Sequence, residues 1–154
     1  MLEKKTTFER IICTDYDTNA IDKLYRYLCD NEITKIIPAI VDVNQQIKQI
    51  LFDSNEKRFQ SDLVCALAIT HHLFLSQGLS YDYVFSIIRN YSRKYVAIEF
   101  MPLGLYTPKY DDALALPDWY TEEWFARKFE IYFEKISRTV LEKNRILYIG
   151  KVLD

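Results

Sequence analysis

Apolar residues in the first third of the chain form two compact runs separated by a helical stripe. The runs lie within residues 8–14 and 35–41 and predict two short buried strands. Between them, apolar side chains recur at the spacing of one helix face over residues 21–28. The polar cluster before this stripe offers Thr18 or Asn19 as the N-cap. The pattern therefore predicts the order strand, helix, strand.

The middle of the chain continues this alternation. A weak apolar stripe over residues 44–52 predicts another helix, and the polar stretch 54–61 predicts a connection. Residues 63–69, LVCALAI, are apolar on both faces, as expected of a central parallel strand covered by helices on each side. Apolar positions then recur at helical spacing over residues 84–91, with Ser80 as the expected cap.

The last third predicts a different ending. Residues 94–100 predict another strand, so that strands and helices alternate as in an α/β fold with a mostly parallel sheet. The segment 101–120, rich in proline and aromatic residues, interrupts the pattern. A helix is expected after Thr121, which would cap it. A strand to Leu141, a turn at residues 142–144 and a final strand then predict an antiparallel hairpin.

Glycine is scarce in this sequence. The chain has 3 glycines in 154 residues, where an average share near 7% would give about 11. Phosphate cradles of the dinucleotide and P-loop types need clustered glycines, because backbone N–H groups must approach the phosphate closely. The sequence excludes both devices. The net charge of −2, without runs of like charge, also gives no sign of binding to nucleic acid or to an anionic membrane.

The cysteines and the apolar runs indicate the cellular compartment in which we expect the protein. Cys13, Cys29 and Cys65 are an odd number without a C-x-x-C pair, so neither a disulfide framework nor a zinc site is indicated. We expect each to be a small buried residue in a reducing compartment. The first ten residues lack the apolar core of a signal peptide, and the longest apolar run is too short to cross a membrane. The resulting expectation is a cytoplasmic location.

Two acidic residues follow predicted strands, where ligands of open α/β sheets bind. Asp15 ends the first strand, and a carboxylate there can accept hydrogen bonds from both hydroxyls of a ribose. Asp42 follows the second strand and could meet an exocyclic amine of a base. Each carboxylate could equally cap the helix that follows it, so both interpretations stay open.

The two histidines of the chain, His71 and His72, are adjacent and directly follow the predicted central strand. Imidazole suits proton transfer near neutral pH, so we expect one of them to line a site. A buried histidine bonded to loop backbone would explain the position as well. No further ligand lies at metal-binding spacing, so no metal is expected. Glu99, at the end of the next strand, could join the same cleft or pair with Lys94 or Arg93.

The interrupting segment is itself a candidate. Connections of this length are commonly functional, and we expect Tyr106, Trp119 and Tyr120 to contact the substrate as part of a lid. The alternative is that these aromatic side chains pack an irregular loop onto the core.

Taken in order, these segments resemble class I S-adenosylmethionine-dependent methyltransferases. The resemblance spans about residues 8–152 and is carried by ICTDYDTNAIDKLY, IIPAIVDV, SDLVCALAITHHL, YVAIEFMPLG, WYTEEWFARKFEIYF and RILYIGKV. The sequence is especially similar to a bacterial, nodulation-protein-like group with an A-L-A-x-x-H-H-L segment and a Y-T-x-E-x-F segment. The implied fold is α/β and Rossmann-like, a mostly parallel sheet with helices on both faces and a C-terminal antiparallel β-hairpin.

The resemblance also implies a cofactor, S-adenosylmethionine, and contacts to it. Asp15 matches the acidic residue that holds the ribose hydroxyls, and Tyr16 lies beside the adenine. Asp42 and Val43 match the segment that contacts the adenine amino group.

The histidine pair would carry the chemistry. His71 and His72 match the segment that faces the methyl group and the acceptor, which makes them the expected catalytic residues. The implied reaction is an in-line methyl transfer, with one imidazole as the base or orienting group. The sequence does not specify the methyl acceptor.

One unit of the family's fold has no counterpart in this sequence. Class I enzymes begin with a strand, a Gly-x-Gly-type loop and a helix, whereas this chain starts at what resembles the second strand. The single domain predicted over residues 1–154 is therefore incomplete, and two of its strands would flank an empty position. We expect residues 1–7, a second copy of the chain, or an N-terminal segment of a longer or split protein to fill it.

The sequence has two further interpretations. The chain could be a non-catalytic partner that keeps the methyltransferase-like fold as an interaction surface. A receiver-like flavodoxin fold is disfavoured, because Met101 and Pro102 follow the strand ending at Phe100 in place of a Lys-Pro pair, and such domains lack a terminal hairpin.

Overall fold

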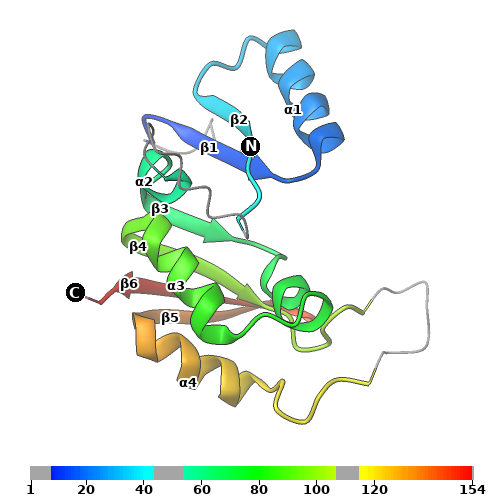
Figure 1. Cartoon of the computed structure of the whole chain (residues 1–154), viewed down its shortest axis with the longest axis vertical. Coiled ribbons are helices and arrows are strands. Elements are labelled where there is room, and N and C mark those ends of the chain that lie inside the picture. Colours follow the sequence, from blue (N-terminus) through cyan, green and yellow to red (C-terminus); the bar gives the residue numbers. More distant parts are fainter. Residues whose placement is uncertain (1–7, 44–53, 107–114, 154) are drawn as a thin grey trace. The chain divides into compact units, whose positions relative to one another are not determined.

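Helices and strands alternate along residues 8–43, 54–106 and 115–153, the part of the chain that the computed structural model describes (Figure 1). The chain divides into two units, Met1–Phe59 (unit 1) and Gln60–Asp154 (unit 2). The predicted α/β class is confirmed. That the chain forms one domain remains a prediction.

Unit 1 holds a parallel strand pair joined by a helix. Strands β1 (Ile11–Asp15) and β2 (Ile36–Ile40) pair in parallel, with Asp15 opposite Ile40. Helix α1 (Thr18–Asp30) connects them, which confirms the predicted order. The predicted cap is wrong by one residue. Asp17 is the N-cap, because its carboxylate accepts the N–H of Asn19 at 2.8 Å. The predicted helix at residues 44–52 lies outside the described residues.

Unit 2 contains a mixed four-stranded sheet in the order β3-β4-β6-β5. Strands β3 (Ser61–Ala66) and β4 (Ser92–Phe100) are parallel. Strand β6 (Arg145–Val152) runs antiparallel to β4 and to β5 (Phe133–Glu142). The predicted C-terminal hairpin is therefore confirmed.

Two helices of unit 2 each begin directly after a residue whose side chain caps the helix N-terminus. Ser80 caps α3 (Tyr81–Tyr91) and Thr121 caps α4 (Glu122–Tyr132), as predicted. In each case a hydroxyl oxygen accepts the N–H three residues on, at 3.2 and 3.1 Å. A short π-helical segment, η1 (His72–Ser76), follows β3. In unit 1, the stretch predicted to be a plain connection contains one helical turn, α2 (Asn55–Arg58).

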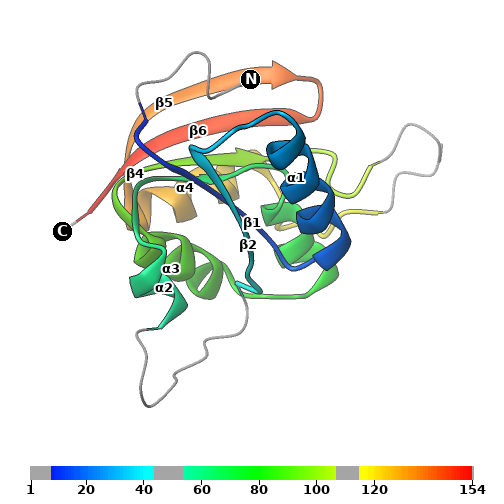
Figure 2. The ribbon, with the colours of Figure 1, turned by 90° about the horizontal axis from the view of Figure 1, so that it is seen from above.

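One face of the unit 2 sheet is covered by α3 and α4, which lie on the same side of it (Figure 2). Phe85 of α3 is fully buried and meets Phe125 and Phe133 edge to face, with ring centroids 5.5 and 6.1 Å apart. Such aromatic pairs each add roughly 0.5–1.5 kcal/mol beyond the area they bury. The apolar strand residues buried beneath the helices are Ala66, Val96, Ile98, Phe100, Phe133, Ile146 and Tyr148.

The observed exposure of the cysteines and the bounds of β3 correct two predictions. Cys65 was expected to be buried, but it is exposed, because its neighbours Val64 and Ala66 take the helix-covered face and Cys65 points away from it. Cys29, on α1, is exposed as well. The predicted strand at residues 63–69 also shifts, since β3 begins at Ser61 and ends at Ala66.

Four strands have one open edge each within the described part of the chain, namely β1 and β2 in unit 1 and β3 and β5 in unit 2. Strand β1 pairs with β2 and with no other described strand, and β3 pairs likewise with β4. The second edge of each strand therefore presents backbone N–H and C=O groups without a ladder partner among the described residues.

Candidate functional site

The carboxyl edge of the β1–β2 pair carries the expected cofactor-binding residues. The N–H of Val41 donates to the Asp15 carbonyl at 3.0 Å, so the parallel pairing continues to the ends of both strands. Asp15 and Tyr16 therefore leave the sheet at the same edge as Asp42 and Val43. The strand register brings these four residues to one edge of unit 1.

The side chains at this edge suit a polar ligand with an aromatic part. Asp15 is exposed, and its Oδ1 accepts the N–H of Asp17 at 3.0 Å. An ionised carboxylate has about four acceptor positions, so this bond leaves capacity for further donors. Tyr16 is 73% exposed, so its ring is free to stack on a planar group. Asp42 and Val43 are half-buried.

The carboxyl edge of the β3–β4 pair carries the histidines. His71 and His72 follow β3, and Glu99 is the penultimate residue of β4. The two imidazoles are in contact, with ring centroids 4.1 Å apart. They differ in environment, because His71 is 5% exposed whereas His72 is exposed to solvent.

The buried imidazole is uncharged at neutral pH. Burial, and to a lesser extent the neighbouring His72 and Arg145, together lower the pKa of His71 to about 4. Among the described residues, Nδ1 of His71 is the buried side-chain nitrogen or oxygen that has no hydrogen-bond partner. Leaving such an atom unpaired costs about 1–3 kcal/mol. A neutral imidazole can accept a proton or a hydrogen bond from a bound nucleophile.

Glu99 is anchored within the protein. It is 3% exposed, and its Oε2 accepts the N–H of Ala68 at 2.8 Å. Arg145 donates to both carboxylate oxygens at 3.3 and 3.4 Å. The predicted partners are engaged elsewhere, since Lys94 pairs with Asp62 and Arg93 bonds to Gln60. The partner that sequence reasoning missed, Arg145, lies 46 residues away in the chain and offers no local signal.

The aromatic residues expected to contact substrate occupy three different environments. Tyr120 is buried, and its hydroxyl donates to the Met101 carbonyl at 3.2 Å. Its ring packs 5.1 Å from that of Phe100, and burial raises the pKa of its phenol. Tyr120 therefore has the contacts of a core residue. Trp119 is 45% exposed and Tyr106 is half-buried. Residues 107–114 of the proposed lid lie outside the described residues.

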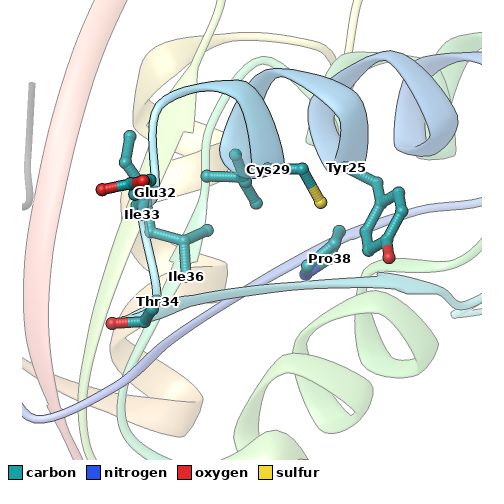
Figure 3. Close-up of a pocket in the computed structure, with 8 residues that line it drawn as sticks. Tyr25, Cys29, Glu32, Ile33, Thr34, Ile36 and Pro38 are labelled. Carbon is teal, nitrogen blue, oxygen red and sulfur yellow. The ribbon is translucent and has the colours of Figure 1, made fainter.

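A pocket in unit 1 lies between α1 and β2 (Figure 3). Tyr25 and Cys29 of α1 face Pro38 of β2 across it. Its volume of about 220 Å³ is below the roughly 300–1,000 Å³ of typical ligand sites. None of the expected site residues lines it. We therefore do not place the site there.

Two further properties concern the described residues alone. They contain no group of three or more His, Cys, Asp or Glu side chains that could hold a metal ion. None of the described helices is both long enough and apolar enough to span a membrane.

Comparisons with known proteins identify the fold. No family model and no curated protein matches the sequence. Among solved structures, the PH0226 protein from Pyrococcus horikoshii OT3 is 15% identical with a TM-score of 0.64, and the match covers 94% of this chain and 72% of that one. A SAM-dependent methyltransferase from Aquifex aeolicus is 10% identical with a TM-score of 0.61, covering 94% and 69%. The N-methyltransferase NodS from Bradyrhizobium japonicum WM9 is 12% identical with a TM-score of 0.58, covering 94% and 74%. The chain therefore has a class I methyltransferase-like α/β fold with a mixed sheet.

Proposed function

We propose that the chain takes part in S-adenosylmethionine-dependent methyl transfer to an acceptor nucleophile. The observation that carries this proposal is the gathering of Asp15, Tyr16, Asp42 and Val43 at the carboxyl edge of a parallel strand pair, within a methyltransferase-like fold. Ligands of open α/β sheets bind at this edge. Two of the three structural neighbours described above are named as methyltransferases, which supports the same reaction class.

The residues of unit 1 fit the nucleoside part of this cofactor. The exposed carboxylate of Asp15 would accept the hydrogen bonds of the two ribose hydroxyls. The exposed ring of Tyr16 would stack on the adenine, and Asp42 and Val43 would meet the adenine amino group. When bound, the cofactor supplies an electrophilic methyl group on a sulfonium sulfur.

The residues of unit 2 would serve the acceptor. The segment with His71 and His72 would orient the acceptor nucleophile toward the methyl group that the cofactor supplies. An imidazole of this segment would accept the proton that the nucleophile loses on methylation. His71 is neutral at pH 7 and can therefore take this proton. Glu99, Tyr106, Trp119 and Tyr120 were expected to contact substrate, and of these Trp119 has the most exposed position.

We also propose that an additional parallel strand completes the cofactor site. The open edges of β1 and β3 are each suited to receive one, because a parallel strand would satisfy their backbone groups. A second copy of the chain or an N-terminal segment would supply this strand, with the backbone that holds the methionine part of the cofactor.

Calorimetric titration of S-adenosylmethionine into the chain tests the proposal. We expect saturable binding that Asp15→Asn weakens at least tenfold, because hydrogen bonds to a charged acceptor contribute about 1.5–3 kcal/mol. Asp22→Asn is the matched control, since this exposed carboxylate pairs with Arg26 on the surface of α1. The absence of heat at millimolar cofactor would contradict cofactor binding by the chain alone and favour a non-catalytic interaction domain.

The roles of the histidines are tested separately. His71→Ala and His72→Ala should leave the affinity for the cofactor unchanged while lowering transfer of a labelled methyl group to an acceptor. Unchanged transfer rates in both variants would remove their proposed role.

A further inference from the structure

We infer that Glu99 and Arg145 form a positioning pair that holds the turn between β3 and η1, and with it the imidazole of His71. The inference deepens the proposed function, since it concerns the residues that would serve the acceptor. The pair consists of a buried carboxylate at the end of β4 and a guanidinium at the start of β6, joined at 3.3 and 3.4 Å.

The turn that the pair holds has an unusual backbone conformation. Ala68 has a φ of +52°, in the left-handed region that residues with a Cβ rarely adopt. Such a conformation persists only where surrounding contacts fix it. The N–H of Ala68 donates to the Glu99 carboxylate at 2.8 Å, which is one such contact.

A second bond ties the turn to the same residue. Thr70, which is fully buried, donates its hydroxyl to the backbone carbonyl of Glu99 at 2.7 Å. Glu99 therefore holds the chain at Ala68 through its side chain and at Thr70 through its backbone. His71 is the next residue, so its position follows from these two bonds.

Arg145 makes this arrangement possible by compensating the charge of Glu99. A carboxylate in a buried position is costly unless a cation and hydrogen bonds offset the loss of water. Arg145 supplies the cation from β6, with a side chain that is 40% exposed. Its charge also disfavours protonation of His71, as does His72 on the turn itself. The pair thus fixes the turn, and Arg145 helps to keep the imidazole uncharged.

Nuclear magnetic resonance of the two histidines measures this directly in the full chain. The chain has 2 histidines, so His72→Gln assigns their signals. In the wild type we expect the His71 signal to titrate near pH 4. In Arg145→Gln the midpoint should rise by about 0.3–0.5 pH units, the order of magnitude expected when one neighbouring positive charge is removed in a water-like dielectric. Hydrogen exchange of the Ala68 amide should quicken at least tenfold in Glu99→Ala.

Conservative and control variants separate positioning from general stability. Arg145→Lys keeps the charge, so the His71 midpoint should stay at its wild-type value. Lys94→Gln removes a cation from β4 that pairs with Asp62, and it should change neither the midpoint nor the exchange of Ala68. Because Arg145 is partly exposed, its variants provide the test even if Glu99→Ala does not fold.

The result that overturns the inference is an unchanged His71 midpoint in Arg145→Gln, or a shift of the same size in Lys94→Gln. Unchanged exchange of Ala68 in a folded Glu99→Ala protein overturns it as well. Both readouts are taken without cofactor, so a failure of the calorimetric test of the proposed function is distinguishable from a failure of this inference.

Discussion

Replacement of Gly150 by alanine should destabilise unit 2, because this glycine allows two aromatic side chains to approach the sheet. Gly150 lies in β6, and it is buried beneath α4 and the start of β5. A Cβ at this position would lie 2.6 Å from Cζ and 2.9 Å from Cε1 of Phe129. It would also lie 2.9 Å from Cβ of Phe133. Carbon atoms in good contact are about 3.5–4.0 Å apart, so something must move.

The neighbours have little room to move. Phe129 and Phe133 are fully buried, with their rings 5.0 Å apart, and Phe129 also packs 5.5 Å from the ring of Tyr148. Overpacking of this kind costs about 1–3 kcal/mol. Replacing a strand glycine by alanine recovers roughly 0.5–1 kcal/mol of backbone entropy. The net loss in the free energy of unfolding should be about 1–2 kcal/mol, or about 3–6 °C in Tm.

The assay is urea unfolding followed by near-ultraviolet circular dichroism, which reports the packing of the aromatic core. Gly78→Ala is the matched control, because Gly78 has a φ of +64° but no atom within 4 Å of a Cβ. The left-handed conformation costs an alanine about 1–2 kcal/mol, and the lower entropy of the unfolded chain recovers roughly 0.4–1 kcal/mol of this, so Gly78→Ala should lose about 0.5–1 kcal/mol. In a Phe129→Leu background the clash is relieved, so the cost of Gly150→Ala should fall. An equal cost in both backgrounds, or a cost no greater than that of Gly78→Ala, would refute the reasoning.

Three further predictions concern charge and capping. The pKa of His71 is about 4 in the folded chain against 6.5 for an unperturbed histidine, so the unfolded chain binds more protons between these values. The free energy of unfolding should therefore fall as the pH drops from 6.5 to about 4. In His71→Gln, urea titrations over this pH range should show a smaller fall. An equally steep fall in the variant would contradict the assignment of this pH dependence to His71. Thr121→Ala removes the acceptor of the Trp124 N–H and should cost about 1 kcal/mol in thermal unfolding, whereas Thr121→Ser should restore it. Tyr148→Phe removes the hydroxyl that donates to Glu122 at 2.8 Å. The variant should raise the pKa of the Glu122 carboxyl and lower the free energy of unfolding by about 1 kcal/mol. An unchanged Glu122 pKa, measured by carboxyl NMR, would contradict a contribution from this hydrogen bond.

Local features of the sequence predicted the regular elements well. Ser80 and Thr121 were identified as caps from the polar residue before each apolar stripe, and both make the expected bonds. The hairpin was predicted from two runs of strand-forming residues around a polar turn, and β5 and β6 pair accordingly. These features depend on residues a few positions apart, so the sequence contains their whole cause.

The boundaries that the sequence misplaced depend on neighbours elsewhere. Residues 67–69 are apolar and were expected to extend the central strand, but β3 ends at Ala66. The left-handed turn at Ala68 is fixed by Glu99, 31 residues away. The cap of α1, in contrast, depends on a local contact. The carboxylate of Asp17, the residue before Thr18, accepts the N–H of Asn19 and makes Asp17 the N-cap.

Some features of the candidate site could likewise be predicted from the sequence, and others could not. Chain order alone places Asp15, Asp42 and the histidine pair at or after the ends of strands. Parallel pairing then brings Asp15 and Asp42 to the carboxyl edge of the β1–β2 pair, and the histidines to that of the β3–β4 pair. Sequence could not distinguish a buried His71 from an exposed His72, because burial depends on what packs against the turn. Nor could it show that Tyr120 lies in the core.

By itself, therefore, the sequence predicted the strands, the helices α1, α3 and α4, their order, and the caps of α3 and α4. Tertiary structure decided that Glu99 pairs with Arg145 and that Gly150 faces Phe129. The physical reason is that antiparallel pairing of β4 with β6 sets Glu99 opposite Leu147, within reach of the start of β6. That register follows from the packing of the whole sheet against α3 and α4, which no short stretch of sequence contains.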